Sequence, residues 1–82
     1  MKDRDVSARV VQRAFVHLGC EARFDGSYLR VIRHLPERVV VSKQHLHKGP
    51  ADTIRRGALR TMFRYQLCFT SEEFYAAVDV VS

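Results

Sequence analysis

The sequence predicts a small α+β domain in which helices cover one face of a three-stranded antiparallel sheet. An apolar stripe with helical spacing opens the chain, alternating apolar and polar residues follow over about residues 21–42, and a second helical stripe comes after them. The chain has 82 residues, of which 46% are hydrophobic and 28% are charged. This size and composition are those of one globular domain spanning residues 1–82, with no room for a separate nucleotide-binding domain.

The first helix is expected from about Asp5 to Leu18. Asp3 or Asp5 is expected to cap its start, and Gly19 is expected to end it in a left-handed conformation. The apolar stripe that predicts this helix consists of Val6, Val10, Val11, Ala14, Phe15 and Leu18.

Three antiparallel strands are expected next. The first ends at a tight turn at Asp25-Gly26, the second covers Ser27 to His34, and the third covers Arg38 to Ser42. The side chains expected to face the helices are Leu29, Val31, Val39 and Val41. Those expected on the opposite, open face are Tyr28, Arg30, Ile32 and His34.

A polar loop is expected from Lys43 to Thr53, followed by a helix that Asp52 or Thr53 caps. Gly57 either weakens this helix or marks its true start. Thr70 to Glu73 form a capping box for a last short helix, through about Val78. The stripe of the longer helix consists of Ile54, Ala58, Leu59, Met62, Phe63 and Leu67. The resulting α-β-β-β-α(-α) order, in two layers, is that of double-stranded-RNA-binding-like (dsRBD-like) folds.

The charge is lopsided toward arginine. The formal net charge is +5, and eleven arginines stand beside three lysines. The planar guanidinium suits phosphate better than an ammonium does, so nucleic acid or another acidic partner is expected; a merely solvated basic surface is the alternative. No apolar leader and no apolar run of membrane-spanning length occurs, so we expect a cytoplasmic protein without a membrane partner. Cys20 and Cys68 are expected to be free thiols.

Five short segments carry a resemblance to a known family. They are the first helix ending at Leu18-Gly19, the Gly26-Ser27 turn, the strand ending at Val39–Val41, the segment Gly57–Arg60, and the closing Thr70–Phe74. In order and spacing, over nearly the whole chain, they resemble the HicA (YcfA-like) toxins. The resemblance implies a dsRBD-like fold, RNA as the target, mRNA interferase (endonuclease) activity and a HicB antitoxin as partner.

The chain departs from this family at the residue that matters most for catalysis. Family members read Gly-Ser-His in the hairpin, with the histidine catalytic, whereas this chain reads Gly26-Ser27-Tyr28. An imidazole exchanges its proton near neutral pH, whereas a phenol does so only near pH 10 and is a poor general base. The chain is therefore a non-catalytic relative, an inactive engineered copy, or an enzyme in which another histidine has taken over.

The candidate catalytic residues are Tyr28, at the family's histidine position, and alternatively His45 and His47. Two histidines in a basic loop could accept and donate the two protons that RNA cleavage moves. As metal ligands they are too few, so no metal and no small-molecule cofactor is expected. The alternatives without a catalytic role are that Tyr28 is only an exposed tyrosine on a strand and that the loop with His45 and His47 only carries charge.

The candidate RNA-binding residues are basic or lie in the hairpin turn. Arg55 and Arg56 are expected in the first turn of a helix, where backbone N–H groups also attract phosphate. The full set is Ser27, Arg30, Lys43, Lys48, Arg55, Arg56 and Arg60. Two other functions fit the same composition: a non-catalytic module that binds an acidic protein partner, and a basic DNA-associated protein.

Overall fold

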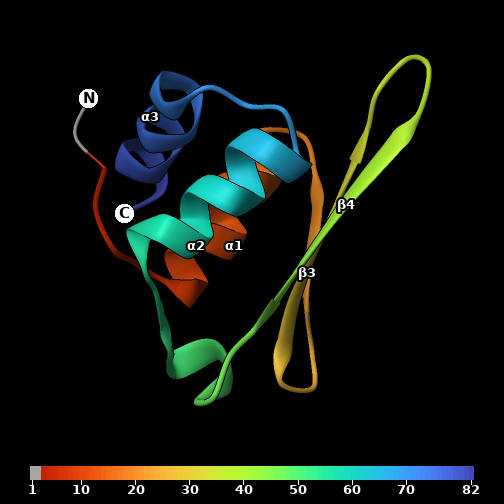
Figure 1. Cartoon of the computed structure of the whole chain (residues 1–82). Coiled ribbons are helices and arrows are strands. Elements are labelled where there is room, and N and C mark those ends of the chain that lie inside the picture. The colour runs from red at the N-terminus through yellow and green to blue at the C-terminus, as the bar shows by residue number, and fades with distance from the viewer. Residues whose placement is uncertain (1–2) are drawn as a thin grey trace.

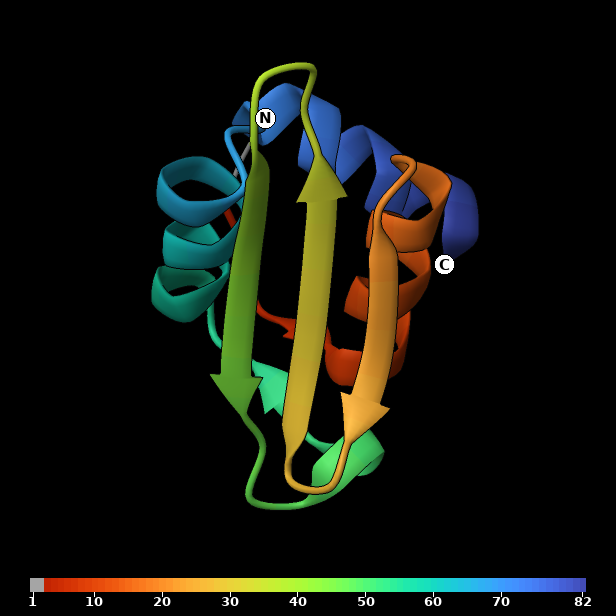
Figure 2. The same cartoon turned by 90° about the vertical axis from the view of Figure 1, so that its right-hand side faces the viewer.

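The computed structural model describes residues 3–82 and confirms the α+β class, with a three-stranded antiparallel sheet and helices on one of its faces (Figures 1 and 2). The sheet order is β2-β3-β4, so each strand lies beside its neighbours in the chain. The elements are β1 (Val6–Ser7), α1 (Ala8–His17), β2 (Glu21–Asp25), β3 (Tyr28–His34), β4 (Val39–His45), η1 (Gly49–Ala51), β5 (Thr53–Ile54), α2 (Arg56–Arg60), η2 (Thr61–Gln66) and α3 (Ser71–Val81).

The first helix begins later than the sequence predicts. Val6 and Ser7 form a short strand that pairs antiparallel with Thr53–Ile54, a second sheet that the sequence analysis missed. The hydroxyl of Ser7 then caps α1 by accepting the backbone N–H of Val10 at 3.3 Å. The expected caps, Asp3 and Asp5, are therefore wrong, because the β1–β5 pairing moves the helix start beyond them.

The end of α1 confirms the expected left-handed glycine. Gly19 has φ +89°. Its N–H donates to the carbonyl of Val16 at 3.0 Å, and the N–H of Cys20 donates to the carbonyl of Phe15 at 2.9 Å. These two bonds form a Schellman motif, which directs the chain from α1 into β2.

The hairpin between β2 and β3 turns at Gly26-Ser27, one residue later than the expected Asp25-Gly26. Asp25 and Tyr28 are partners across the strands, which leaves a two-residue loop. Gly26 has φ +59°, the left-handed value that the first central residue of such a loop requires.

The expected orientation of β4 is wrong by one residue. Leu29 and Val31 are fully buried beneath the helices as expected, but Val39 and Val41 are 53% and 47% exposed on the open face. Ser42 faces the helices instead and donates its hydroxyl hydrogen to Oε1 of Gln66 at 2.5 Å. Three consecutive valines fit a strand in either orientation, so only the pairing with β3 decides which of them faces inward.

The strand β4 also runs three residues further than expected, to His45. The expected polar loop from Lys43 to Thr53 is therefore wrong over its first three residues, which pair with β3. The remaining connection, from Leu46 onward, contains the short helix η1 and then the strand β5.

The second helix also begins later than expected, at Arg56 with Arg55 as its N-cap residue, because Thr53 and Ile54 are in β5. Gly57 stands in its first turn, which agrees with the alternative that this glycine marks the helix start. The helix then widens into the π-helical segment η2, where the N–H of Leu67 donates to the carbonyl of Met62 at 2.9 Å.

The last helix, α3, has the predicted capping box. The Thr70 hydroxyl accepts the backbone N–H of Glu73 at 3.1 Å, and the Glu73 carboxylate accepts the N–H of Thr70 at 3.0 Å. The helix runs to Val81 rather than to about Val78.

The core is an aromatic cluster contributed by three helical segments. Phe74 of α3 stacks on Phe63 of η2, with ring centroids 4.7 Å apart and an angle of 10° between the planes. Phe15 of α1 packs against Phe74 at 5.1 Å. Tyr75 is buried, and its hydroxyl bonds the backbone of Arg4. Segment 74–78 thus lies largely in the core.

The register of β4 can be tested with one substitution on each face. Val31→Thr places a hydroxyl in the dry core without a partner and should lower the free energy of unfolding by about 1–3 kcal/mol. Val41→Thr makes the same change on the open face and should alter it by no more than about 0.5 kcal/mol. Denaturant unfolding of both variants measures the difference, and equal costs would contradict this register.

The capping box makes stability depend on pH. Hydrogen bonds from Thr70 hold the pKa of Glu73 below its ordinary value, so the ionised carboxylate stabilises the folded chain. This contribution is complete above the pKa of an unfolded glutamate and is lost as the pH falls through the lower folded value. The stability advantage of wild type over Glu73→Gln should therefore be present at neutral pH and disappear in acid.

Denaturant unfolding of wild type and variant across this pH range measures the effect. Glu72→Gln is the matched control, because Glu72 lies in the same helical turn and takes part in no side-chain hydrogen bond among residues 3–82. A wild-type advantage over Glu73→Gln that stays constant into acid would show that the ionised carboxylate does not stabilise the cap.

Candidate functional site

The open face of the sheet is organised in rows that run across the three strands. The pairings β2–β3 and β3–β4 bring one residue from each strand side by side. Three rows result: an upper row of Glu21, Ile32 and Val41; a middle row of Arg23, Arg30 and Lys43; and a lower row of Asp25, Tyr28 and His45.

The middle row, here called the basic row, places three cations on neighbouring strands. Arg23 is directly opposite Arg30, and Arg30 is directly opposite Lys43. All three are exposed, and the two ion pairs found among residues 3–82 involve none of them. Like charges directly opposite each other destabilise a sheet, so this row favours the binding of an anion that would offset the repulsion.

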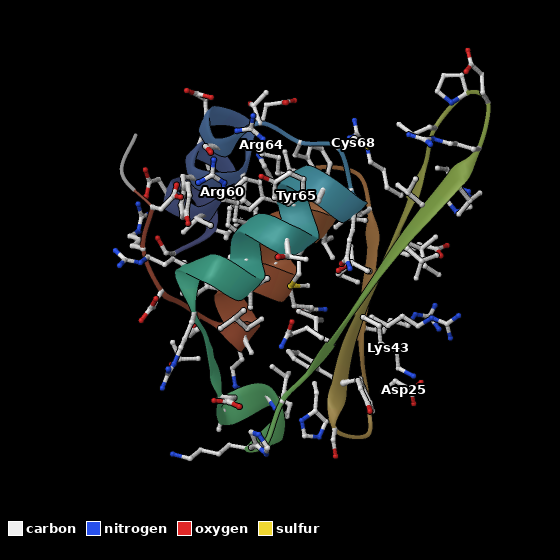
Figure 3. All side chains as sticks on the ribbon, viewed as in Figure 1. Asp25, Lys43, Arg60, Arg64, Tyr65 and Cys68 are labelled. Atoms are coloured by element: carbon white, nitrogen blue, oxygen red, sulfur yellow. The ribbon has the colours of Figure 1, made fainter. Side chains whose placement is uncertain are left out.

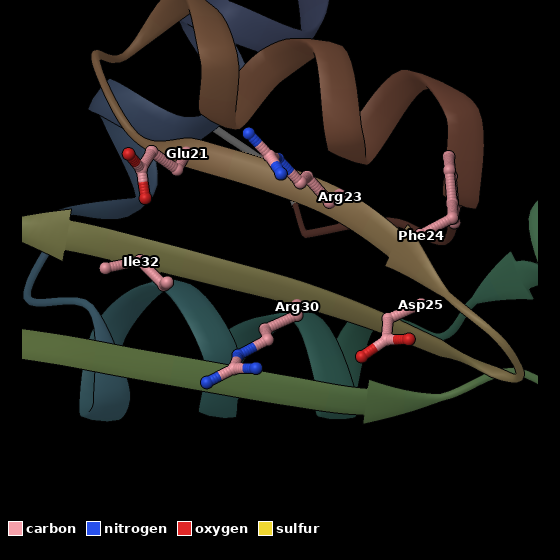
Figure 4. A pocket seen from close by; sticks show the side chains of 6 residues that line it. All are labelled: Glu21, Arg23, Phe24, Asp25, Arg30 and Ile32. Atoms are coloured by element: carbon pink, nitrogen blue, oxygen red, sulfur yellow. The ribbon is translucent and has the colours of Figure 1, made fainter.

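A shallow hollow of about 500 Å³ lies over the β2–β3 side of the basic row (Figure 4). The close-up shows Arg23 and Arg30 on the same side of the ribbon as the carboxylates of Glu21 and Asp25. The lining residues are Glu21, Arg23, Phe24, Asp25, Arg30 and Ile32. The two carboxylates flank the basic row along the strand direction, which confines the positive potential to a band across the sheet.

Three aromatic rings meet directly below the basic row, and we call them the ring cluster: Tyr28, His45 and His47. The Tyr28 and His45 centroids are 5.1 Å apart at 68°, and those of His45 and His47 are 4.7 Å apart at 88°. The Nζ atom of Lys43 lies 4.3 Å from the centroid of the Tyr28 ring, a cation–π contact that joins the cluster to the basic row.

The structure therefore brings together the two candidate catalytic sites that the sequence left as alternatives. Tyr28 and His45 are cross-strand partners, and His47 follows His45 directly after β4 ends. The sequence analysis treated both histidines as loop residues, because it ended the third strand at Ser42. The extension of β4 by pairing with β3 is what carries His45 next to Tyr28.

Arg55 lies on the other side of the two histidines. It shares with His45 and His47 a hollow of about 520 Å³ between the end of β4 and the start of α2. Asp52 also lines this hollow, and the N–H of Thr53, which donates to its carboxylate at 2.8 Å, holds the pKa of Asp52 below its ordinary value. The lining of this hollow thus includes one carboxylate, Asp52, and one guanidinium, Arg55.

Two further candidates are at the turns near the ring cluster. The carbonyl of Ser27 accepts the N–H of Leu46 at 2.6 Å, which ties the β2–β3 turn to the end of β4. The side chain of Lys48 is exposed, and its backbone N–H donates to Oδ2 of Asp52 at 3.4 Å.

The other two candidate arginines, Arg56 and Arg60, are in α2, in the helical layer. The backbone N–H of Arg56 donates to Oδ1 of Asp5 at 2.9 Å. One backbone donor at the start of α2 is therefore already bonded to a carboxylate of this chain. Arg60 projects from the helical layer, whereas Lys43 projects from the opposite side of the sheet (Figure 3). The sequence-based group of Arg55, Arg56 and Arg60 with Lys43 and Lys48 is therefore divided between different surfaces.

Arg23 is the member of the basic row that the sequence analysis missed. Its signal was present in the hairpin, because a two-residue turn at Gly26-Ser27 places residues whose numbers add to 53 opposite each other. That rule pairs Arg23 with Arg30. Placing the turn one residue earlier concealed the pair.

The two histidines of the ring cluster have no third metal-ligating side chain beside them among residues 3–82. Within residues 3–82, no three histidine, cysteine, aspartate or glutamate side chains come close enough together to hold a metal ion. Both cysteines are free, with Cys20 buried and Cys68 exposed. Burial raises the pKa of the Cys20 thiol.

None of the helices in the described part of the chain is long and apolar enough to cross a membrane. Comparison of the chain with known protein-family models, curated proteins and solved structures finds no match. The function is therefore inferred from the chemistry of the open face and from the resemblance in the sequence.

Proposed function

We propose that the chain binds RNA on the open face of its sheet, as the toxin component of a HicA-like toxin–antitoxin pair. The observation that carries this proposal is the basic row next to the ring cluster, on a sheet face that no helix of residues 3–82 covers. A HicB-like antitoxin as partner belongs to the proposal through the resemblance in sequence.

The basic row supplies the phosphate contacts. Two of its three members are arginines, whose planar forks bind phosphate oxygens in pairs, and Lys43 adds a third charge across β4. A phosphodiester chain that crosses the strands along the row meets all three cations in turn. This direction keeps the chain clear of the carboxylates of Glu21 and Asp25 on either side.

The ring cluster supplies the base contacts. Tyr28 and His45 are exposed on the same face, one row below the cations. Exposed aromatic rings on a sheet bind unpaired bases by stacking, and single-stranded RNA can turn its bases out toward them. We therefore assign single-stranded RNA, rather than duplex, as the ligand.

RNA cleavage is a second candidate activity, favoured by the contact between His45 and His47. In this reaction the 2′ oxygen bonds to phosphorus and the bond from phosphorus to the 5′ oxygen breaks. One imidazole accepts the 2′-hydroxyl proton, and the other, protonated, donates to the leaving 5′ oxygen. The products are a cyclic phosphate and a free 5′ hydroxyl, with no metal in the proton balance.

The binding proposal predicts which arginine sets the salt dependence. Arg30→Gln should weaken binding of a short single-stranded RNA and make the slope of log affinity against log salt shallower by about 0.7, the value for one lost phosphate contact. Arg60→Gln removes the same charge from the helical side and should leave the slope unchanged. Fluorescence anisotropy over a salt series measures both; the reverse result would place the footprint on α2.

The cleavage proposal predicts which ring carries the chemistry. His45→Ala and His47→Ala should each abolish the production of cyclic phosphate from a single-stranded RNA, whereas Tyr28→Phe should retain it, because the phenol is not needed as a base. Gel analysis of the products from wild type, these three variants and Tyr28→His gives the comparison. An inactive wild type that gains cleavage only in Tyr28→His would reject the histidine pair and leave this chain as an RNA-binding protein.

A further inference from the structure

The sheet has two outer edges, one along β2 and one along β4. At the β2 edge, the side-chain amide of Gln12 on α1 donates to the carbonyl of Ala22 at 2.9 Å, so a helical side chain takes up one outward carbonyl of this edge. Among residues 3–82, the outer side of β4 has no strand beside it, and the segments α2 and η2 lie behind this edge, on the inner side of the sheet (Figure 2).

The hydrogen bonds at the two ends of the β3–β4 hairpin fix the direction of every backbone group in β4. Leu46 donates its N–H to Ser27 at 2.6 Å, and Leu35 donates its N–H to Arg38 at 2.8 Å. Each bond joins directly opposed residues, and such bonded pairs alternate along an antiparallel ladder. The β4 residues that face β3 are Val40, Ser42 and Gln44; those whose N–H and C=O face outward are Val39, Val41, Lys43 and His45.

Most of these outward groups are free. The carbonyl of His45 accepts the side-chain amide of its neighbour Gln44 at 3.2 Å. For Val39, Val41 and Lys43, no hydrogen bond to the outward N–H or C=O exists among residues 3–82. The side chains of both valines are about half exposed beside these groups.

Most of this edge lacks the features that usually prevent strand pairing, and Lys43 is the one charged residue of β4. Exposed edges are commonly interrupted by proline, a bulge, or charged residues along most of their length. The pairing of β4 with β3 is regular over all seven residues, and its first four residues carry neither charge nor proline. The edge is therefore able to accept a further strand.

We propose that the outer edge of β4 binds an extended acidic peptide segment of a partner protein as a fourth, antiparallel strand. Charge selects this occupant: the chain carries a net charge of +5, and Lys43 lies on this edge with Arg30 directly behind it. A second copy of the chain would bring two basic rows together, whereas an acidic segment offsets their charge. This proposal does not depend on RNA binding.

The geometry specifies the pattern of the segment. Residues opposite Val39, Val41 and Lys43 place their side chains on the open face and exchange two backbone hydrogen bonds each with β4. In an antiparallel strand these positions read acid-x-apolar-x-apolar from the N-terminus. The acid lies beside Lys43, and the two apolar side chains cover the exposed valines.

Backbone methylation of a synthetic peptide tests the pairing directly. In the peptide Glu-Thr-Val-Thr-Val, the amide of the central Val points toward β4 and that of the following Thr points away. N-methylation at that Val should weaken binding to the wild-type chain by about tenfold or more, whereas N-methylation at the Thr is the matched control and should have little effect. Equal effects of the two methyl groups, or no binding of the parent peptide, would overturn the proposal.

A protein variant provides the second test. Val41→Pro removes an outward N–H but no bond to β3, so the hairpin keeps its ladder while the peptide should lose about tenfold in affinity. Circular dichroism checks the fold, and the peptide comparison above stands even where this variant does not fold. Self-association of wild type that Val41→Pro abolishes, without peptide binding, would assign the edge to a second copy and overturn the proposal.

Discussion

The register between β3 and β4 is the constraint on which the rest of this structure depends. The Ser27–Leu46 and Leu35–Arg38 bonds close the ladder at both ends, so each β4 residue has one partner. Side chains alternate along a strand. A slip of one residue would therefore turn Lys43 toward the core, and it would turn the residues next to the exposed valines toward solvent. The hydrogen bond between Ser42 and Gln66 opposes such a slip, since the slip would turn Ser42 to the open face and break the bond.

The helical layer explains why only one face of the sheet is dry. Phe15, Phe63 and Phe74 come from three helical segments and stack against one another on the same side of the sheet. A chain of this size has few large apolar side chains, and three of its five phenylalanines are in this cluster. The opposite face therefore carries rows of charged and aromatic side chains. These side chains remain hydrated and accessible to a ligand.

Two surfaces with different chemistry meet at Lys43. Its side chain lies over the ring of Tyr28 in the open face, and its backbone N–H and C=O face the free edge of β4. The open face offers cations and rings, which suit phosphate and bases, whereas the edge offers main-chain donors and acceptors beside exposed valines. The proposed ligand is RNA for the first surface and a strand of a partner protein for the second.

The sequence by itself determined the α+β class, the left-handed end of α1 at Gly19 and the capping box at Thr70, because each depends on short-range spacing or on local hydrogen bonds. It also singled out Tyr28, His45 and His47. Only the tertiary structure decided that these three rings touch, that Arg23 completes the basic row, and which β4 residues face solvent. Each of those depends on pairing between strands, and a run of three valines or a turn misplaced by one residue leaves that pairing undetermined until the helices bury one face.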